Sequence, residues 1–216
     1  MRVIAGEFRS RPLQAPRGVA TRPTSDRLRQ ALFNVLEMGG LGPALAGSRF
    51  VDLYAGSGAV GIEAISRGAQ FVWFAEDARP ALAAIWANLA QLKVAGGFAV
   101  EDRGAARLLR ELAARGQTVD FVFLDPPYEM AEAYEETLQV LAPQAKGSEP
   151  AAGKLSAAIL SAGILSAGAL VVAEHARKRP LPESYAALQR VRVLEQGDAA
   201  LSFYRVRQPG SEMVSR

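Results

Sequence analysis

Short apolar runs alternate with longer amphipathic stretches along the first two thirds of the chain. Most runs are followed by an acid, which is typical of a buried strand that ends at the edge of a sheet. The stretches between them have the spacing of helices that cover a sheet. We therefore expect strands at residues 49–51, 71–75, 98–100 and 119–124, and helices at 25–37, 62–67 and 79–92. Strands that alternate with helices indicate an α/β fold on a parallel sheet.

The last third of the chain has a different pattern. Residues 155–173 carry no charge and are nearly long enough to cross a bilayer, but their serine and glycine content favours a small-residue helix and turn that lead into a strand at 169–173. Two further apolar runs, at 191–194 and 201–206, flank a polar turn and predict an antiparallel hairpin. The polar residues 208–216 are expected to form a disordered tail.

Composition excludes several classes of site. The chain of 216 residues has the size of one α/β domain with a sizeable core, so we treat residues 1–216 as a single domain. It has no cysteine and one histidine, so we expect no disulfide and no metal site. That histidine, His175, is expected to end the fifth strand. Arg2, Glu7 and Arg9 occur where a signal peptide would be apolar, so we expect a cytoplasmic protein without a membrane partner.

The tetrapeptide Asp125-Pro126-Pro127-Tyr128, which follows the apolar run 119–124, forms a corner whose groups suit binding or catalysis. The two prolines fix φ and remove two backbone donors, which leaves the Asp125 carboxylate and the Pro126 carbonyl as acceptors beside an aromatic ring. Such a corner can bind an exocyclic amino group while Tyr128 stacks on the ring that carries it. The alternative is a strand-ending acid, a proline stop and a tyrosine at the edge of the core.

A glycine-rich loop at residues 52–61 joins the first expected strand to a helix. Gly56, Gly58 and Gly61 satisfy the pattern G-x-G-x-x-G, in which missing side chains let the backbone approach a ligand and let the helix pack tightly on the sheet. A nicotinamide dinucleotide would place its pyrophosphate at the helix N-terminus. S-adenosylmethionine would instead place its amino-acid end there and use a nearby acid such as Asp52. A tight turn that needs only small residues is the structural alternative.

Two further acids follow the second and third strands. Glu76 lies twenty positions after Gly56, where a carboxylate is expected to accept hydrogen bonds from both ribose hydroxyls of a bound cofactor. Asp77 could take that role instead, or either acid could serve only as an N-terminal charge for the helix at 79–92. Asp102 could receive the adenine amino group, although the charged residues around it also fit a solvated turn.

Positive charge is concentrated at the N-terminal end. Residues 1–29 carry seven arginines and two acids, a net charge of +5, whereas the whole chain carries +3. Arginine binds phosphate through a forked pair of hydrogen bonds, so this segment can supply sequence-independent RNA affinity, unless its arginines are merely solvated. Arg22 and Thr24 have a sharper candidate role, because Pro23 stiffens them and the helix at 25–37 would hold them near the catalytic corner. The other candidate phosphate contacts are Arg2, Arg9, Arg11 and Arg17.

Together, the glycine loop, Glu76 and the corner at 125–128 resemble class I S-adenosylmethionine-dependent methyltransferases. The corner is similar to that of enzymes which methylate exocyclic amines of nucleic-acid bases. Residues 2–11, residues 21–27 and the helix through 32–34 resemble the RsmD family of bacterial 16S rRNA guanine-N2 methyltransferases. The three motifs occur in the order of that family, and the likeness covers nearly the whole chain.

The resemblance implies a Rossmann-like fold: a seven-stranded, mostly parallel sheet with helices on both faces and an N-terminal β-hairpin extension. It implies S-adenosylmethionine as the cofactor, and a guanine of 16S rRNA or of a small-subunit assembly particle as the substrate. Asp125 and the Pro126 carbonyl would accept the two N–H bonds of an amine on a base flipped out of its stack, and Tyr128 would stack on that base. Residues 1–24 would form a basic RNA-binding extension of a monomer.

The chain departs from the family in two places. The family shows Asn or Asp followed by Ala after the third strand, where this chain has Asp102-Arg103-Gly104, and residues 143–161 look like an insertion. Two other functions fit the same motifs. An adenine-N6 methyltransferase would use nearly the same corner. A non-catalytic rRNA assembly factor would need the basic end and could dispense with the corner and the glycine loop.

Overall fold

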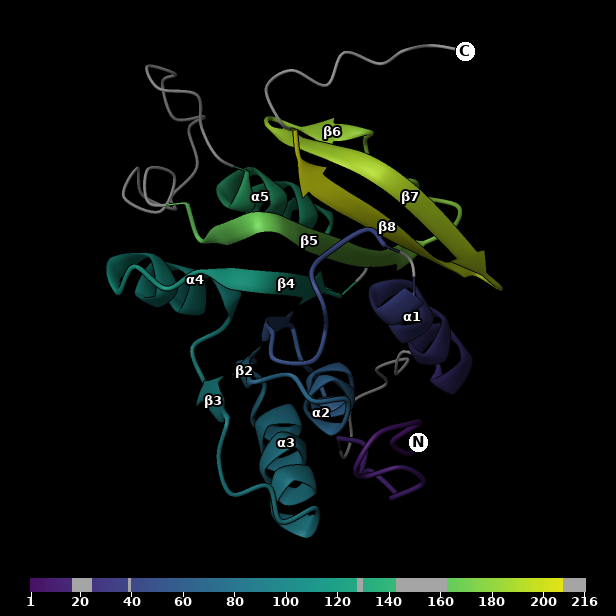
Figure 1. Cartoon of the computed structure of the whole chain (residues 1–216), viewed down its shortest axis with the longest axis vertical. Helices are drawn as coiled ribbons and strands as arrows, with labels where there is room; N and C mark the ends of the chain where they lie inside the picture. Colours follow the sequence, from purple (N-terminus) through teal and green to yellow (C-terminus); the bar gives the residue numbers. More distant parts are fainter. Residues whose placement is uncertain (17–24, 39, 128–129, 143–162, 208–216) are drawn as a thin grey trace.

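Eight strands form one sheet in the described part of the computed structural model, which comprises residues 1–16, 25–38, 40–127, 130–142 and 163–207 (Figure 1). Their order across the sheet is β3-β2-β1-β4-β5-β8-β7-β6. The neighbours from β3 to β5 run parallel, and β8, β7 and β6 are antiparallel to their neighbours. In chain order the strands are β1 (Arg49–Leu53), β2 (Phe71–Ala75), β3 (Phe98–Glu101), β4 (Val119–Leu124), β5 (Leu165–Ala176), β6 (Ser184–Tyr185), β7 (Leu188–Gln196) and β8 (Ala199–Val206).

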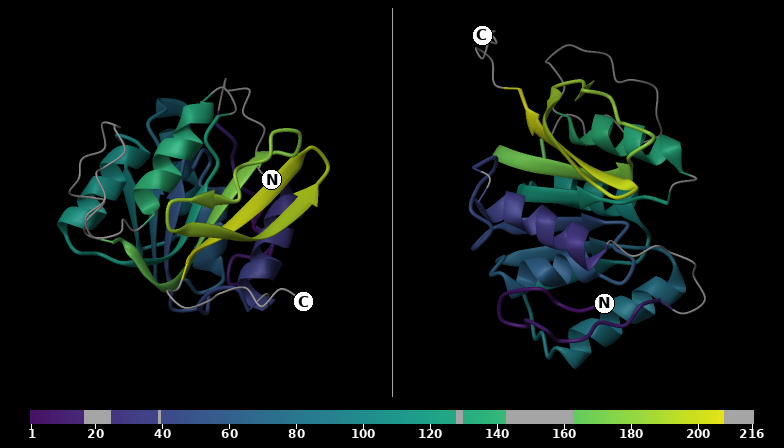
Figure 2. Two further views of the ribbon diagram at one scale, coloured as in Figure 1. Left: turned by 90° about the horizontal axis from the view of Figure 1, so that it is seen from above. Right: turned by 90° about the vertical axis from the view of Figure 1, so that its right-hand side faces the viewer.

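Helices cover both faces of this sheet (Figure 2). On one face, α1 (Asp26–Met38), α2 (Ala59–Ser66) and α3 (Arg79–Gln91) supply side chains to a first hydrophobic core. On the other face, α4 (Ala105–Ala114) and α5 (Ala131–Leu141) pack into a second core. The prediction of an α/β fold with helices on both faces of a mostly parallel sheet is confirmed.

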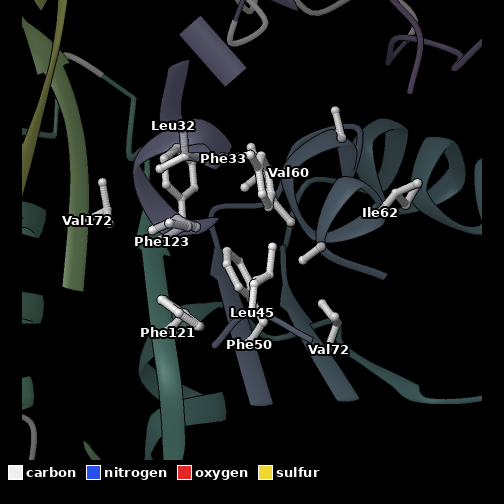
Figure 3. Packing of buried hydrophobic residues seen from close by; sticks show 14 of the residues in the cluster. Leu32, Phe33, Leu45, Phe50, Val60, Ile62, Val72, Phe121, Phe123 and Val172 are labelled. Atoms are coloured by element: carbon white, nitrogen blue, oxygen red, sulfur yellow. The ribbon is translucent and has the colours of Figure 1, made fainter. Parts of the chain in front are cut away.

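The aromatic residues of the first core show why the central strands read as continuous apolar runs (Figure 3). The ring centroid of Phe50 in β1 lies 6.3 Å from that of Phe33 in α1 and 6.0 Å from that of Phe121 in β4. The next residue, Val51, belongs to the core on the opposite face. Because successive residues of a strand point to opposite faces, a strand covered on both sides needs apolar residues at every position.

Most expected elements are present with shifted ends. The strands expected at 71–75 and 119–124 have those bounds, and the first strand continues to Leu53, so that Asp52 lies inside β1. The terminal hairpin is longer than expected because it comprises all of β7 and β8. The expected count of seven strands was one short among the described residues, because the two-residue β6 adds a further edge to β7.

The prediction of a small-residue helix and turn before residue 169 was wrong for residues 165–168, which belong to β5. Val119 pairs with Leu165, and the backbone nitrogen of Val119 donates to the carbonyl of Ile164 at 2.8 Å. Pairing with a neighbouring strand thus outweighs the low strand propensity of serine and glycine. Residues 155–162 lie outside the described part. Within the described part, no helix combines the length and the apolar character that a membrane crossing requires.

The N-terminal residues 1–14 fold back on themselves, but through one antiparallel bridge, between Arg2 and Pro12, and not through two regular strands. The Val3 nitrogen donates to the Arg11 carbonyl at 2.9 Å, and the Ser10 nitrogen donates to the Val3 carbonyl at 2.9 Å. This segment, which we call the arm, lies against α2 and α3 (Figures 1 and 2). The predicted β-hairpin extension is therefore present in an irregular form.

Candidate active site

Acidic side chains gather where β1, β4 and β5 end. In the parallel register, Leu53 pairs with Leu124, and Leu124 pairs with Ala173. Asp52, Asp125 and Glu174 are each one position from that row, and Asp125 interacts electrostatically with both of the others. In open α/β sheets, ligands bind outside the carboxyl ends of the strands, so this edge is the candidate active site.

Asp125 is a desolvated acceptor at the centre of this edge. Burial raises the pKa of its carboxyl well above the ordinary value, and the charges of Glu174 and Asp52 raise it further. No described residue donates a hydrogen bond to the carboxyl of Asp125. An arriving N–H donor or positive charge would favour the ionised form, because it would offset the burial and the two like charges. The site therefore favours a ligand that brings one or both.

The Pro126 carbonyl, the second acceptor of the corner, belongs to a buried residue. It lies 3.4 Å from the hydroxyl of Tyr134 in α5, which donates at 2.8 Å to the carbonyl of Glu174. Because that hydroxyl has one proton and its shorter bond is to Glu174, the Pro126 carbonyl keeps capacity for another donor. Tyr134 thus connects the corner after β4 to β5. The third predicted catalytic residue, Tyr128, lies outside the described residues.

Where β1 leads into the glycine loop, Asp52 is buried and Tyr54 has a left-handed backbone. Asp52 is 1% exposed and accepts a hydrogen bond from the backbone nitrogen of Gly61 at 2.8 Å. Burial raises the pKa of Asp52 to about 8, against the lowering effect of that hydrogen bond, and the charge of Glu76 raises it further. Tyr54 has a φ of 60°, a left-handed conformation that is costly for a residue with a side chain. Its hydroxyl lies 3.3 Å from that of Thr137 in α5.

The three glycines of the loop are needed for different reasons. Gly56 has a φ of 57°, and a Cβ atom placed there would enter open space with no atom within 4 Å. At Gly58, with a φ of 75°, a Cβ would meet Ile85 at 3.2 Å, so the limits are conformation and packing against α3. At Gly61 a Cβ would lie 2.3 Å from the ring of Phe74 in β2. Gly56 therefore borders the space for a ligand, whereas Gly61 lets α2 approach the sheet.

Glu76 joins the glycine loop to the end of β2. Its Oε2 accepts a hydrogen bond from the backbone nitrogen of Gly56 at 2.8 Å. Its Oε1 accepts from the nitrogens of Asp77 and Ala78 at 3.0 and 2.9 Å, at the beginning of α3. A carboxylate has about four acceptor positions and these three bonds use three of them, so Glu76 can hold this turn and still accept from one ribose hydroxyl through Oε2. Asp77, the alternative, faces Gly104, where a Cβ would meet its Oδ2 at 3.3 Å.

Two neighbouring acids where β3 ends, Glu101 and Asp102, have different roles. Glu101 is 9% exposed and accepts three hydrogen bonds from Arg103: from the backbone nitrogen at 3.0 Å, from Nε at 2.9 Å and from Nη2 at 3.3 Å. The side chain of Asp102 is 73% exposed and lies 3.8 Å from Arg103 Nε. Asp102 thus keeps acceptor capacity for an adenine amino group, while Glu101 fixes the loop.

Some residues of the site cannot be recognised from the sequence, because their role depends on contacts between distant segments. Glu174 was given no role in the site from the sequence, yet its charge acts on Asp125. His175 lies within β5 one residue before its end, is 3% exposed, and has Nε2 at 2.9 Å from the hydroxyl of Ser202 in β8. Burial lowers the pKa of His175, which suits a neutral packed side chain. The alternation of glutamate and histidine at the end of an apolar strand was the available signal.

The arm is fixed to α2 by a buried carboxylate. Glu63 is fully buried, and its two oxygens accept hydrogen bonds from the backbone nitrogens of Ile4 and Ala5 at 2.7 and 2.9 Å. Its charge is balanced by Arg67, whose Nε lies 2.8 Å away, and by the buried Arg29 at 3.8 Å. The arm is therefore part of the folded structure and not a loose cationic tail.

Asn88 of α3 connects the arm to the glycine loop. It is fully buried, accepts from the backbone nitrogen of Gln14 at 2.7 Å and donates to the Gln14 carbonyl at 3.1 Å. The same amide group donates to the carbonyl of Ser57 at 2.9 Å. The hydroxyl of Ser57 also lies 3.7 Å from the sulfur of Met1. Sequence reading gave no sign of this residue, because an asparagine inside a helix is usually unremarkable.

The arginines proposed to bind RNA divide into two groups. Arg2, Arg9 and Arg11 are exposed on the arm, and none forms an ion pair with another described residue. Arg17, Arg22 and Thr24 lie outside the described part of the chain, as does the whole of the insertion at 143–161. In the described residues, no group of three or more His, Asp or Glu side chains is arranged to hold a metal ion.

Comparison with known proteins identifies the family. Residues 1–152, well over half of the 216 residues, match the family described as Conserved hypothetical protein 95. The chain belongs to this family. The match includes the arm, the glycine loop, Glu76 and the corner at Asp125, whereas Glu174 at the end of β5 lies beyond it.

Relatives of this family member carry names that refer to rRNA. The chain is 33% identical over 207 residues to the Bacillus subtilis protein named "Putative rRNA methyltransferase YlbH", with 96% of this chain and 100% of that protein aligned. It is 38% identical over 141 residues to "Ribosomal RNA small subunit methyltransferase D" of Escherichia coli, with 65% of this chain and 66% of that protein aligned.

Solved structures support the fold assignment. "Putative methyltransferase yhhF" of Escherichia coli is 30% identical with a TM-score of 0.70, and the match covers 95% of this chain and 97% of that one. SMU.776, a protein crystallised in complex with SAH, is 12% identical with a TM-score of 0.59, over 83% of this chain and 48% of that one. The Conserved hypothetical protein 95 member described here therefore has the fold of S-adenosylmethionine-dependent methyltransferases.

Proposed function

We propose that this protein uses S-adenosylmethionine to methylate the exocyclic N2 amine of a guanine in the rRNA of the small ribosomal subunit. The observation that carries the proposal is the pairing of two features on adjacent strands. The acceptors of Asp125 and Pro126 follow β4, and the glycine loop follows β1, its parallel neighbour. The names of the relatives support rRNA as the substrate, and the likeness of residues 2–11 and 21–27 to RsmD proteins supports guanine N2.

The described residues fit the cofactor. The open space beside Gly56 accommodates a ligand against the loop backbone, and Glu76 beside it retains an acceptor position for a ribose hydroxyl. Asp102, exposed after β3, is the acceptor for the adenine amino group, and Asp52 lies under the start of α2, on the side of the amino-acid end. When bound, S-adenosylmethionine supplies an electrophilic methyl group.

The chain's own residues orient the target amine. The lone pair of a guanine amine is delocalised into the purine ring, so the nitrogen must be held with that lone pair directed at the methyl group. Asp125 and the Pro126 carbonyl would do this by accepting the two N–H bonds. Asp125 need not be a strong base, because the amine becomes acidic only after it is methylated. The N–H bonds and the positive charge of the cofactor both favour the ionised form of Asp125 and so lower its raised pKa.

A base can reach these acceptors only if it leaves its stack. We propose that the target guanine is flipped and that Tyr128 stacks on it, a contact worth roughly 1–3 kcal/mol per base. Arg22 and Thr24 would position the flipped nucleotide. Arg2, Arg9 and Arg11, exposed on the arm, would bind phosphates of the surrounding RNA.

One experiment tests the proposal directly. The protein is incubated with methyl-labelled S-adenosylmethionine and small-subunit RNA from cells that lack it, and the labelled nucleotide is mapped by mass spectrometry. We expect label on N2 of one guanine. Label on N6 of an adenine would replace the proposal with an adenine methyltransferase, and RNA binding without any label would favour the non-catalytic assembly factor. Assembled subunits and partly assembled particles serve as parallel substrates.

A further inference from the structure

Three consecutive cations follow β5 at the candidate active edge. Arg177, Lys178 and Arg179 come directly after Ala176, the last residue of the strand, and all three are exposed. Arg177 is three residues beyond Glu174, which corresponds to about 10 Å along an extended chain. Because the charge of Glu174 acts on Asp125, this cationic segment begins close to the catalytic corner. We call residues 177–179 the basic turn.

The basic turn is fixed by its backbone. The nitrogen of Arg177 donates to the carbonyl of Asp198 in the turn between β7 and β8 at 2.8 Å. The nitrogen of Arg179 donates back to the carbonyl of Ala176 at 2.9 Å, and Pro180 follows. Figure 1 shows the arrowheads of β4, β5 and β7 pointing the same way, so the turn lies on the side of the molecule where these strands end. Because the backbone of the basic turn is hydrogen-bonded at both ends, its three side chains extend from fixed positions.

The charges of the basic turn are not balanced within the described structure. None of the three side chains forms an ion pair with another described residue. Several other cations are paired: Arg103, Arg107 and Arg115 all lie within 3.6 Å of Glu111, and Arg190 lies 3.5 Å from Glu183. Three adjacent like charges repel one another, and an anionic partner would relieve that repulsion.

The basic turn and the arm flank the catalytic corner from opposite sides. The arm contacts α2 and α3, the helices that follow β1 and β2 along the chain, whereas the turn follows β5 and contacts the β7–β8 turn. In the sheet order β2-β1-β4-β5, the glycine loop and Asp125 lie between them. A strand of RNA that places one base at Asp125 must continue in both directions from that base.

We propose that the basic turn binds phosphates of the substrate RNA on the side of the target base opposite to the arm. The inference rests on the proposed function for the identity of the nucleic acid as RNA. Phosphate suits the surface because guanidinium groups bind it in a forked geometry and lysine binds it as a point charge. None of the large exposed hydrophobic residues belongs to the turn, so an apolar protein partner has nothing there to bind. The two cationic segments thus hold the RNA across the active edge.

The test replaces Arg177, Lys178 and Arg179 together by Gln and measures RNA binding at several salt concentrations. The ligand is small-subunit rRNA transcribed without modification. The matched control replaces Lys93, Arg110 and Arg115, which are also one lysine and two arginines and are all exposed. Lys93 follows α3, Arg110 lies in α4 and Arg115 follows α4, toward the opposite edge of the sheet. We expect the turn variant to bind RNA more weakly and to show a salt slope smaller by roughly 0.7 per lost phosphate contact. The control should keep the wild-type slope, and both variants should keep wild-type affinity for S-adenosylmethionine.

Two further measurements make the outcome specific. A second variant, Arg177→Lys with Arg179→Lys and Lys178 unchanged, keeps all three positive charges. It should show most of the wild-type salt slope, whereas a folding defect would not be rescued by charge. In phosphate footprints of bound RNA, the turn variant should lose protection on one side of the modified nucleotide, and the variant of Arg2, Arg9 and Arg11 on the other. Losses on the same side, or a wild-type slope in the turn variant, would overturn the inference.

The binding assay does not depend on methyl transfer, so the two proposals can fail separately. If the wild-type protein binds RNA through the basic turn but transfers no methyl group, the proposed function is contradicted and the inference about the turn is supported. A protein that methylates guanine while the turn variant keeps wild-type binding and footprint would do the reverse.

Discussion

The Oε2 atom of Glu76 accepts a hydrogen bond from the backbone nitrogen of Gly56 at 2.8 Å. The end of the second strand thereby holds the loop that follows the first strand. The expected role of Glu76 at the ribose is thus joined to a second role, because the residue shapes the loop before any ligand arrives. Loss of the carboxylate removes both a ligand contact and a loop support.

Glu76→Ala should weaken S-adenosylmethionine binding by about 1.5–3 kcal/mol, the range for charge-assisted hydrogen bonds. Calorimetry at neutral pH measures the effect. Asp77→Ala serves as the control and should bind nearly as well as the wild type. If the two variants exchange their effects, Asp77 and not Glu76 binds the ribose.

Asp125→Asn should leave cofactor affinity nearly intact and lower turnover a hundredfold or more, the order expected when a positioned charge-stabilising acceptor is removed. The amide keeps the shape of the side chain but presents one acceptor oxygen and loses the charge. Single-turnover methylation of rRNA, run beside calorimetry with the cofactor, separates the two effects. Turnover within about threefold of the wild type would remove Asp125 from the mechanism.

The glycines of the loop should respond differently to the same substitution. Gly61→Ala places a Cβ 2.3 Å from the ring of Phe74, so it should lower the free energy of unfolding by about 1–3 kcal/mol through overpacking. Gly56→Ala adds a methyl group in open space and should chiefly impair cofactor binding, with about 1–2 kcal/mol of strain from its left-handed backbone. Urea unfolding and calorimetry on both variants test the distinction. Equal loss of cofactor affinity at equal stability would contradict it.

Asp52 should make the cofactor-free protein less stable as the pH rises. Its pKa is about 8 in the folded state and 3.8 as a free side chain. Between these values the folded protein holds a proton that the unfolded chain has released, so the contribution of Asp52 to stability is complete below about pH 4 and is lost as the pH approaches 8. Asp52→Asn keeps an acceptor for Gly61 and removes the titration. The difference in unfolding free energy between the two proteins should change across this pH window, and a constant difference would show that Asp52 does not titrate there.

Replacing Arg2, Arg9 and Arg11 by Gln should weaken RNA binding and reduce its salt slope by roughly 0.7–0.9 per lost phosphate contact. S-adenosylmethionine affinity should not change, because these exposed side chains form no hydrogen bond with the glycine loop or Glu76 in the described structure. The variant of Lys93, Arg110 and Arg115 controls for total charge. An unchanged salt slope would mean that the arm arginines are merely solvated.

The parts of the fold that the sequence predicted well are those that local chemistry determines. Residues 71–75 and 119–124 could be assigned because each is an apolar run with an acid near its end, as a strand buried on both faces requires. The glycine loop and the Asp125 corner were visible because glycine and proline restrict the backbone wherever they occur. Such patterns can be recognised in the sequence without knowing which residues contact them in the folded protein.

The parts that it did not predict depend on partners far along the chain. Residues 165–168 have a composition that suits a turn, and only pairing with β4 makes them a strand. Asn88 contacts Gln14 across 74 positions, and Glu63 contacts Ile4 across 59. No periodicity marks such residues, because their role comes from burial of a polar group that must be satisfied.

The docking of the arm has a consequence for biosynthesis. Residues 1–14 leave the ribosome before Glu63 and Asn88, the side chains that bind their backbone. Until α3 has emerged, the arm is therefore an unfolded cationic segment on a nascent chain. The arm surface that carries Arg2, Arg9 and Arg11 then forms at the same time as the hydrogen bond from Asn88 to the Ser57 carbonyl in the glycine loop. A truncated chain that ends before α3 would therefore have neither the docked arm nor this support of the loop.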